Sequence, residues 1–125
     1  MIQGIGVDIV DKRRMDHAVR RWGDRFTGRI LTHEEQRACA VKADRIGCIA
    51  ARFAAKEALL KAMGTGLISG MSWKDMEVVS SPEGKPDLKA TGGIALRLNG
   101  CEVHLSLSHE KDHAIAFVVL ERKSP

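Results

Sequence analysis

The sequence lacks several features that define whole classes of protein. It contains no tyrosine, and its few aromatic residues are Trp22, Trp73, Phe26, Phe53 and Phe117. A platform that stacks single-stranded nucleic acid would need more aromatic side chains, so this class is disfavoured. No apolar run reaches transmembrane length, and no charged segment precedes an apolar one as in a secretory signal. We therefore expect no membrane partner.

Cysteine is also scarce. Cys39, Cys48 and Cys101 are far apart and form no Cys-x-x-Cys motif, which argues against a disulfide framework or a zinc knuckle. Such cysteines are typical of a reducing compartment, so we expect a cytoplasmic protein. Internal repeats, low-complexity tracts and linkers are missing as well. The 125 residues therefore predict a single domain, residues 1–125, that is large enough to bury a core.

The charge is modest in sum but unevenly distributed. The chain has 20 Lys and Arg against 16 Asp and Glu, a net charge of +4. Seven basic residues lie within the first thirty: Lys12, Arg13, Arg14, Arg20, Arg21, Arg25 and Arg29. This clustering predicts an acidic partner, either nucleic acid or an acidic protein. A solvated basic helix is the plainer alternative.

Residues 2–10 predict a strand with one unusual face. Gln3, Ile5, Val7 and Ile9 alternate on one side. The other side carries Gly4, Gly6 and Asp8, and glycines inside a strand often mark the close approach of another backbone or a ligand. Asp11 is the better N-cap for the helix that follows, which leaves Asp8 available for another role.

Residues 52–63 predict a long helix, with Asp44 as a possible cap, because Ala, Leu, Lys, Glu and Met dominate the segment. One apolar stripe consists of Ile49, Phe53 and Leu60, flanked by Met63. A smooth face, against which a neighbour can pack closely, consists of Ala50, Ala54, Ala58 and Ala62.

Two charged residues on this helix lack a polar face. Glu57 and Lys61 project about 40° apart, between the apolar stripe and the alanine face. Gly64 is expected to end the helix in the left-handed conformation, before the loop of Thr65 and Gly66. A carboxylate and an amine beside a glycine loop suggest a site for a metal and a phosphate. A salt bridge between Glu57 and Lys61, worth only about 0.2–0.5 kcal/mol when exposed, is the alternative.

Two further helices precede the long one. The first covers residues 12–22, and a capping box of Thr32 and Glu35 opens the second, which extends to about Ala43. This gives one early strand and three helices.

Strands dominate after Gly70. Residues 76–79 predict a short strand, and a turn-rich segment follows it. Residues 87–89 are expected to pair back against that strand. Residues 94–98 are a possible helix. Alternating residues 103–107 and the apolar residues 114–120 predict a hairpin whose return strand is buried. The chain is therefore α+β: an antiparallel sheet wrapped on one long central helix, plus shorter helices.

The combined motifs resemble the holo-[acyl-carrier-protein] synthase family, the small, trimeric class of 4′-phosphopantetheinyl transferases. The resemblance rests on Gly-Val-Asp-Ile-Val at residues 6–10, Arg-Phe-Ala-Ala-Lys-Glu-Ala at residues 52–58 with Lys61, and Gly-Thr-Gly at residues 64–66. Residues 84–86 and 105–109 also look like later segments of the family. The likeness covers essentially the whole chain.

The resemblance implies a magnesium-dependent transfer in fatty acid biosynthesis. The phosphopantetheine arm of coenzyme A passes to a serine of apo acyl carrier protein, and adenosine 3′,5′-bisphosphate leaves. By this likeness Asp8 and Glu57 hold the metal, Glu57 and Lys61 are catalytic, and the coenzyme contacts are as follows: Arg52, Lys61, Gly64, Thr65, Gly66 and His109. The serine proton passes either to Glu57 or to a metal-bound water.

The resemblance also assigns the basic cluster to the acidic carrier protein, so that no nucleic acid is expected. Its docking residues match Arg14, Arg21 and Arg25, with Phe26 as an apolar anchor. Larger relatives carry an Asp-x-Glu pair at the metal, but here the second position is Val10, so that water or substrate fills one ligand place. The family forms homotrimers with sites at the interfaces, and we expect the same here.

Two other interpretations remain. The chain could be a small basic domain that binds RNA or a nucleotide without catalysis, although this leaves Asp8 and Glu57 unexplained. It could also be a structural oligomer in which Glu57 and Lys61 close an interface.

Overall fold

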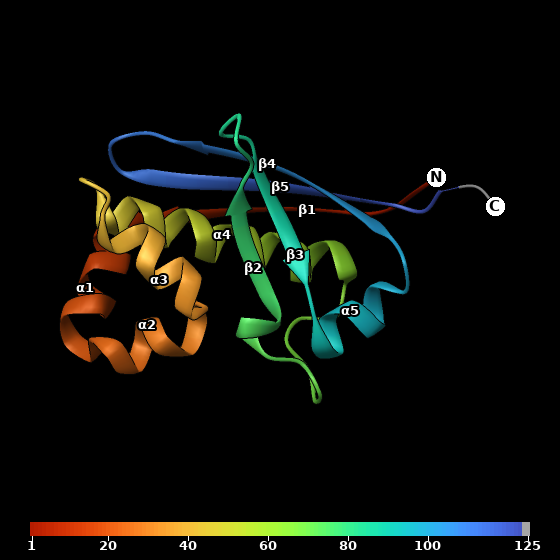
Figure 1. The fold of residues 1–125 in the computed structure, drawn as a ribbon, viewed down its shortest axis with the longest axis horizontal. Coiled ribbons are helices and arrows are strands. Elements are labelled where there is room, and N and C mark those ends of the chain that lie inside the picture. Colours follow the sequence, from red (N-terminus) through yellow and green to blue (C-terminus); the bar gives the residue numbers. More distant parts are fainter. Residues whose placement is uncertain (124–125) are drawn as a thin grey trace.

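The computed structural model of the protein describes residues 1–123. Its elements in chain order are β1 (Ile2–Asp11), α1 (Lys12–Trp22), α2 (Asp24–Ile30), α3 (His33–Ala40), α4 (Arg45–Met63), the 3-10 helix η1 (Trp73–Asp75), β2 (Met76–Ser80), β3 (Pro86–Ala90), α5 (Gly92–Leu98), β4 (Glu102–His109) and β5 (His113–Glu121). Figure 1 shows helices α1 to α3 gathered at one end of α4. The predicted α+β class, with a sheet wrapped on a long central helix, is confirmed.

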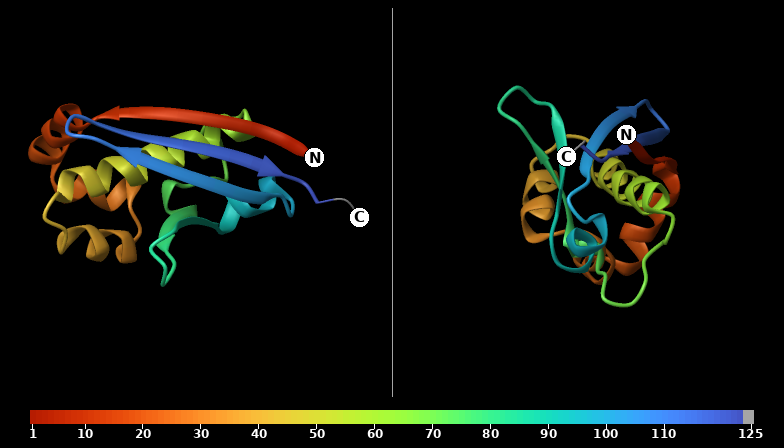
Figure 2. Two further views of the ribbon diagram at one scale, coloured as in Figure 1. Left: turned by 90° about the horizontal axis from the view of Figure 1, so that it is seen from above. Right: turned by 90° about the vertical axis from the view of Figure 1, so that its right-hand side faces the viewer.

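The main sheet has three antiparallel strands in the order β1-β5-β4. The predicted hairpin joins β4 to β5, and β1 pairs with the other side of β5 from Ile2 opposite Glu121 to Asp11 opposite His113. Figure 2 shows this sheet curving along the length of α4. The first and last strands of the chain are therefore neighbours, so that β1 is fixed against the helix that carries Glu57.

A second sheet consists of the hairpin β2-β3, in which Val78 lies opposite Leu88. It crosses α4 on the side away from β1 (Figure 1). Both short strands and the helix α5 agree with the sequence pattern.

The closest packing in the fold lies between β1 and α4. A Cβ atom at Gly4 would overlap the carbonyl of Ala62, and one at Gly6 would overlap the carbonyl of Ala58. Ala54 and Ala58 are completely buried. The predicted alanine face and the predicted glycine face therefore meet each other. This contact holds Asp8, two residues beyond Gly6, beside the helix.

The caps of three helices agree with the sequence. Asp11 accepts a hydrogen bond from the backbone N–H of Arg13, and the capping box of Thr32 and Glu35 is formed. Asp44 caps α4 through the backbone N–H of Gly47. Gly64 ends the helix in the left-handed conformation, with φ of 77°.

Two predictions about the helices are wrong. The sequence pattern does not predict the helix α2, because its seven residues include Thr and Gly, which are weak helix formers, and no side chain caps its start. The helix α3 ends at Ala40 rather than near Ala43. Val41 is 84% exposed, so no apolar contact extends the helix.

The prediction of a wholly buried return strand is also wrong. Ala114, Ala116 and Val118 are buried, but Ile115 and Phe117 on the opposite face are 37% and 43% exposed. The same open face of the sheet carries Ile5, Val7 and Ile9, each more than half exposed. One face of the sheet covers α4, while the other presents apolar side chains to the surroundings.

The cysteine prediction needs correction too. The structure joins Cys39 and Cys48 in a disulfide, with Cα atoms 5.5 Å apart, and leaves Cys101 free. Cys39 lies in the last turn of α3 and Cys48 in the first turn of α4. The reversal between the two helices brings them together, which a spacing of nine residues could not reveal.

Within residues 1–123, no helix is long and apolar enough to cross a membrane.

Candidate functional site

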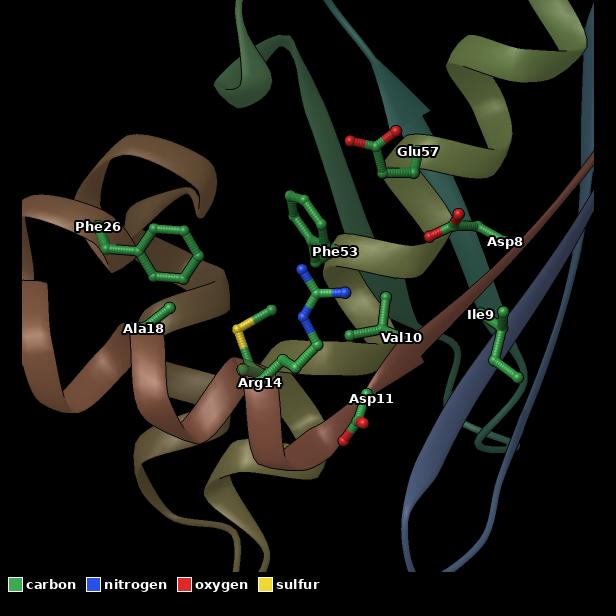
Figure 3. Close-up of a pocket in the computed structure, with 10 residues that line it drawn as sticks. Asp8, Ile9, Val10, Asp11, Arg14, Ala18, Phe26, Phe53 and Glu57 are labelled. Carbon is green, nitrogen blue, oxygen red and sulfur yellow. The ribbon is translucent and has the colours of Figure 1, made fainter.

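The two acids singled out from the sequence line one cavity. Asp8 comes from β1 and Glu57 from α4, and both border a cavity of about 350 Å³. Figure 3 shows their carboxylates at one end of the cavity and Phe26 at the other, with Phe53 between them. The glycine–alanine packing of β1 on α4 thus brings together two acids that are 49 positions apart in the chain.

Lys61 binds Asp8 rather than Glu57. Its Nζ donates to Asp8 Oδ1 at 2.9 Å and to the backbone carbonyl of Val7 at 3.1 Å. The alternative of a Glu57–Lys61 salt bridge is therefore wrong for residues 1–123, where no such pair occurs. The Asp8 side chain is 15% exposed and that of Lys61 53%, so the lysine is more open than its place on the helix suggested.

The charge at Glu57 is poorly compensated. Burial raises the pKa of this carboxyl group above its usual value, the nearby Asp8 carboxylate raises it further, and Lys61 lowers it in part. A cation beside Glu57 would favour the ionised form of this carboxyl group. Two oxygen donors with unbalanced negative charge are suited to a hard divalent ion such as magnesium.

The walls of this cavity are largely apolar. Val10, Met15 and Ala18 line it together with the two phenylalanines. Arg14 of α1 extends its guanidinium into the space between Phe26 and Asp8 (Figure 3). The cavity therefore connects the acids directly to the basic helix.

The other expected docking residues lie on α1 and α2. Arg14 and Arg21 are two turns apart on α1, and Arg25 is exposed on α2. The guanidinium of Arg21 stacks over the ring of Trp22, 5.0 Å from its centre. Trp22 is 51% exposed, and no sequence pattern assigned it a role.

Arg52 and His109 lie elsewhere. They border a second cavity of about 390 Å³, which shares no lining residue with the first. Arg52 donates from Nη1 to Cys48 Sγ at 2.9 Å, while its Nε is buried without a partner. Burial lowers the pKa of this guanidinium. Lys42 and Asp44 also line this cavity, so that it presents two cationic side chains and one carboxylate to a ligand.

The glycine loop lies beyond the end of α4. Gly64 and Gly66 have φ values of 77° and 66°, and the Thr65 hydroxyl donates to the carbonyl of Gly66 at 2.9 Å. Lys61 precedes the loop by one helical turn. Within the described part of the chain, the loop lines neither of the two cavities.

The structure reveals one buried pair that the motifs did not predict. Lys56 and Glu35 are 0% and 1% exposed, and Lys56 Nζ donates to Glu35 Oε1 at 2.6 Å. The signal was present, because Lys56 falls within the apolar stripe of Ile49 and Leu60. A lysine in such a stripe indicates a buried partner.

Known proteins share these motifs. The model of the 4′-phosphopantetheinyl transferase superfamily matches residues 4–118. A holo-[acyl-carrier-protein] synthase of Koribacter versatilis is 47% identical over 124 residues, which cover 97% of this chain and 99% of the relative.

Solved structures show the same similarity. The crystal structure of holo-[acyl-carrier-protein] synthase from Neisseria meningitidis superposes with a TM-score of 0.88 at 38% identity, and covers 98% of this chain and 100% of that one. A holo-(acyl-carrier-protein) synthase from Bacillus anthracis, in complex with CoA (3′,5′-ADP), has a TM-score of 0.82 at 41% identity. That match covers 98% of this chain and 99% of the relative.

Proposed function

The chain belongs to the 4′-phosphopantetheinyl transferase superfamily, and from this premise we propose that it transfers the phosphopantetheine group of coenzyme A to a serine of an apo acyl carrier protein. The serine oxygen forms a bond to the phosphorus that carries pantetheine, and the bond from this phosphorus to adenosine 3′,5′-bisphosphate breaks. The proton of the serine hydroxyl would pass to Glu57 or to a water molecule. The product serves fatty acid biosynthesis. The observation that carries the proposal is the cavity in which Asp8 and Glu57 meet a basic docking helix.

The two acids are suited to holding magnesium. This ion usually takes one or two carboxylates and completes its shell with phosphate oxygens and water. When bound, it would neutralise the charge of the diphosphate and of the leaving group. Val10 occupies the place where larger relatives have a third acid, so the protein supplies only Asp8 and Glu57.

Lys61 and the glycine loop are suited to the phosphates. The Lys61 ammonium already lies at Asp8 and is half exposed, so it can bind a phosphate oxygen without leaving the acid. The N–H of Gly64 caps the helix by donating to the carbonyls of Leu60 and Lys61, so the N–H groups of Thr65 and Gly66 are the ones that would contact a phosphate. A phosphate can come close to the backbone at Gly66, because no atom lies within 4 Å of where a Cβ would stand there.

Arg52 and His109 would serve the site of a neighbouring copy. Their cavity shares no lining residue with that of the acids, and a coenzyme bound between two copies of the chain would contact both sets of residues. The open face of the sheet, with Ile5, Val7 and Phe117, offers an apolar surface for association. A homotrimer with sites at its interfaces accounts for both features.

The carrier protein would dock on α1 and α2. The exposed side chains of Arg14, Arg21 and Arg25 present positive charge to an acidic partner, and Phe26 is half-buried beside them. Such contacts lose strength with salt, because exposed charges are screened over about 8–10 Å at physiological ionic strength. Salt should therefore weaken use of the carrier protein.

The cytoplasmic location belongs to the same proposal. It rests on the small number of cysteines, and because that compartment keeps thiols reduced, it requires that the Cys39–Cys48 bridge is open during function.

Mass spectrometry of an apo carrier protein, incubated with this protein, coenzyme A and magnesium, tests the activity. We expect one serine to gain about 340 Da, the mass of the phosphopantetheine group. Asp8→Ala and Glu57→Ala should each abolish the transfer while the circular dichroism spectrum remains that of the folded protein. Near-normal turnover by either variant in magnesium would remove that acid from the metal site.

A further inference from the structure

The most completely buried charged side chain of the described residues is Lys56. Its Nζ donates to the backbone carbonyl of Ile30 at 2.6 Å and to Glu35 Oε1 at 2.6 Å. Glu35 Oε2 accepts from the backbone N–H of Val78 at 2.8 Å, and Oε1 also accepts from that of Thr32 at 2.9 Å. One ion pair thus joins α4 to the end of α2, to the start of α3 and to β2.

This pair is connected through the chain to residues assigned to the transfer. Lys56 precedes Glu57 in the chain, and Ile30 is the last residue of the helix that carries Phe26. Phe26 of α2 and Phe53 of α4 both line the acid cavity, and Phe53 lies between Phe26 and the two acids (Figure 3). The distance between α2 and α4 therefore determines how far Phe26 lies from Phe53 and the acids.

Stability alone is a weak reason for such a pair. Burial lowers the pKa of Lys56, and Glu35 only partly compensates. Replacing a buried ion pair by apolar side chains is often neutral or stabilising, whereas leaving one partner alone is costly. The Lys56 ammonium, however, binds both the carbonyl at the end of α2 and the carboxylate of α3. It therefore fixes the distance and the orientation of these two helices relative to α4.

We propose that Lys56 and Glu35 are positioning residues, which hold α2 at a fixed distance from the turn of α4 that carries Glu57. This inference rests on the proposed function. A carrier protein docked on Arg25 and Phe26 then presents its serine at the two acids. The pair acts on the reaction through the placement of α2 and touches neither substrate.

The acids themselves are held by a different contact. Gly4 and Gly6 of β1 pack on the carbonyls of Ala62 and Ala58, and this packing does not involve the pair. Removal of the pair should therefore disturb the approach of the carrier protein and leave the magnesium site intact. These two effects can be measured separately.

The test uses the double variant Glu35→Gln, Lys56→Met, which removes both charges and approximately keeps the volume. Assayed well below its melting temperature, it should lose about 10-fold or more in kcat, because small misplacements of reacting groups are costly. The KM for coenzyme A and the Kd for magnesium should change less than about twofold, since the groups assigned to these ligands remain in place. Leu98→Ala, a buried change in α5 away from both α2 and the acid cavity, is the control for lost stability and should keep its kcat.

Two results would overturn the inference. A kcat equal to that of the wild type would make the pair a packing element only. A magnesium affinity that falls as far as kcat would mean that the pair supports the acids rather than α2. If the double variant does not fold, Glu35→Asp, which keeps the charge and withdraws the carboxylate by one methylene, is assayed with the same two criteria. Failure of the wild type to modify any carrier protein would instead reject the proposed function.

Discussion

At the scale of single residues, the raised pKa of Glu57 makes a prediction about stability. Its pKa in the folded protein lies above the ordinary value of 4.5, chiefly through burial and then through Asp8. The folded state therefore holds the proton more tightly than the unfolded state, and the free energy of unfolding falls as the pH rises through the folded pKa. Glu57→Gln should remove this penalty at neutral pH.

Thermal unfolding with a chelator present measures the effect. Near pH 7 we expect Glu57→Gln to be more stable than the wild type by less than about 1 kcal/mol, since Glu57 is partly exposed to solvent. The difference should vanish below about pH 4, where the carboxyl group is neutral in both states. Glu83→Gln, in an exposed turn, is the matched control and should show no gain at either pH. A gain for Glu57→Gln that persists in acid would contradict the assigned cause.

Single residues also show how far the sequence can specify the site. Asp8 and Glu57 could be identified because a carboxylate on a glycine-lined strand and another on an apolar helix both break the local pattern. The partner of Lys61 could not be identified from the sequence. Glu57, one turn away on the same helix, is the partner that the local pattern suggests, whereas Asp8 belongs to another element. Only the packing of β1 on α4 brings the Asp8 carboxylate within 2.9 Å of the ammonium.

At the scale of elements, the contact of β1 with α4 should tolerate no added side chain. Gly6→Ala would place a Cβ against the carbonyl of Ala58 and the backbone N of Ala62, and neither can move without displacing the helix. We expect the free energy of unfolding to fall by about 1–3 kcal/mol. We also expect weaker magnesium binding, because Asp8 would move away from Glu57.

The helix α2 supplies the control. A Cβ atom at Gly28 would meet no other atom within 4 Å, and the residue lies inside a helix, so Gly28→Ala should be neutral or stabilising by about 0.5–1 kcal/mol. Urea denaturation compares the two variants. If Gly6→Ala proved as stable as Gly28→Ala, the close contact would not be what holds the acids together.

Elements also differ in how well local patterns specify them. The strand β1 and the helix α4 follow from periodicity, and α1, α3 and α4 begin at the side-chain caps Asp11, Thr32 and Asp44. The helix α2 has neither signal, since it is short and begins at Gly23 without a side-chain cap. Tertiary contact compensates, because Ile30 at its end is buried and its carbonyl accepts from Lys56. Such support is invisible in the local sequence.

At the scale of the whole molecule, the proposed trimer predicts that each site is built from residues of two copies of the chain. The acids border one cavity, and Arg52 with His109 borders the other. In a cyclic trimer, each interface joins one surface of a subunit to a different surface of its neighbour. If the coenzyme spans such an interface, each site takes its acids from one subunit and its arginine from the next.

Mixed trimers test this arrangement. Asp8→Ala and Arg52→Ala should each lose activity when pure. Equal amounts of the two variants are then unfolded together and refolded. A site is complete wherever the interface joins the intact acids of one variant to the intact arginine of the other. Random assembly makes about one quarter of the interfaces complete, so about one quarter of the wild-type activity should return. Mixing without subunit exchange is the control and should restore nothing. Only a site shared between subunits can be rebuilt from two defective copies. If refolded mixtures formed trimers but remained inactive, the acids and Arg52 would have to bind a coenzyme within one chain.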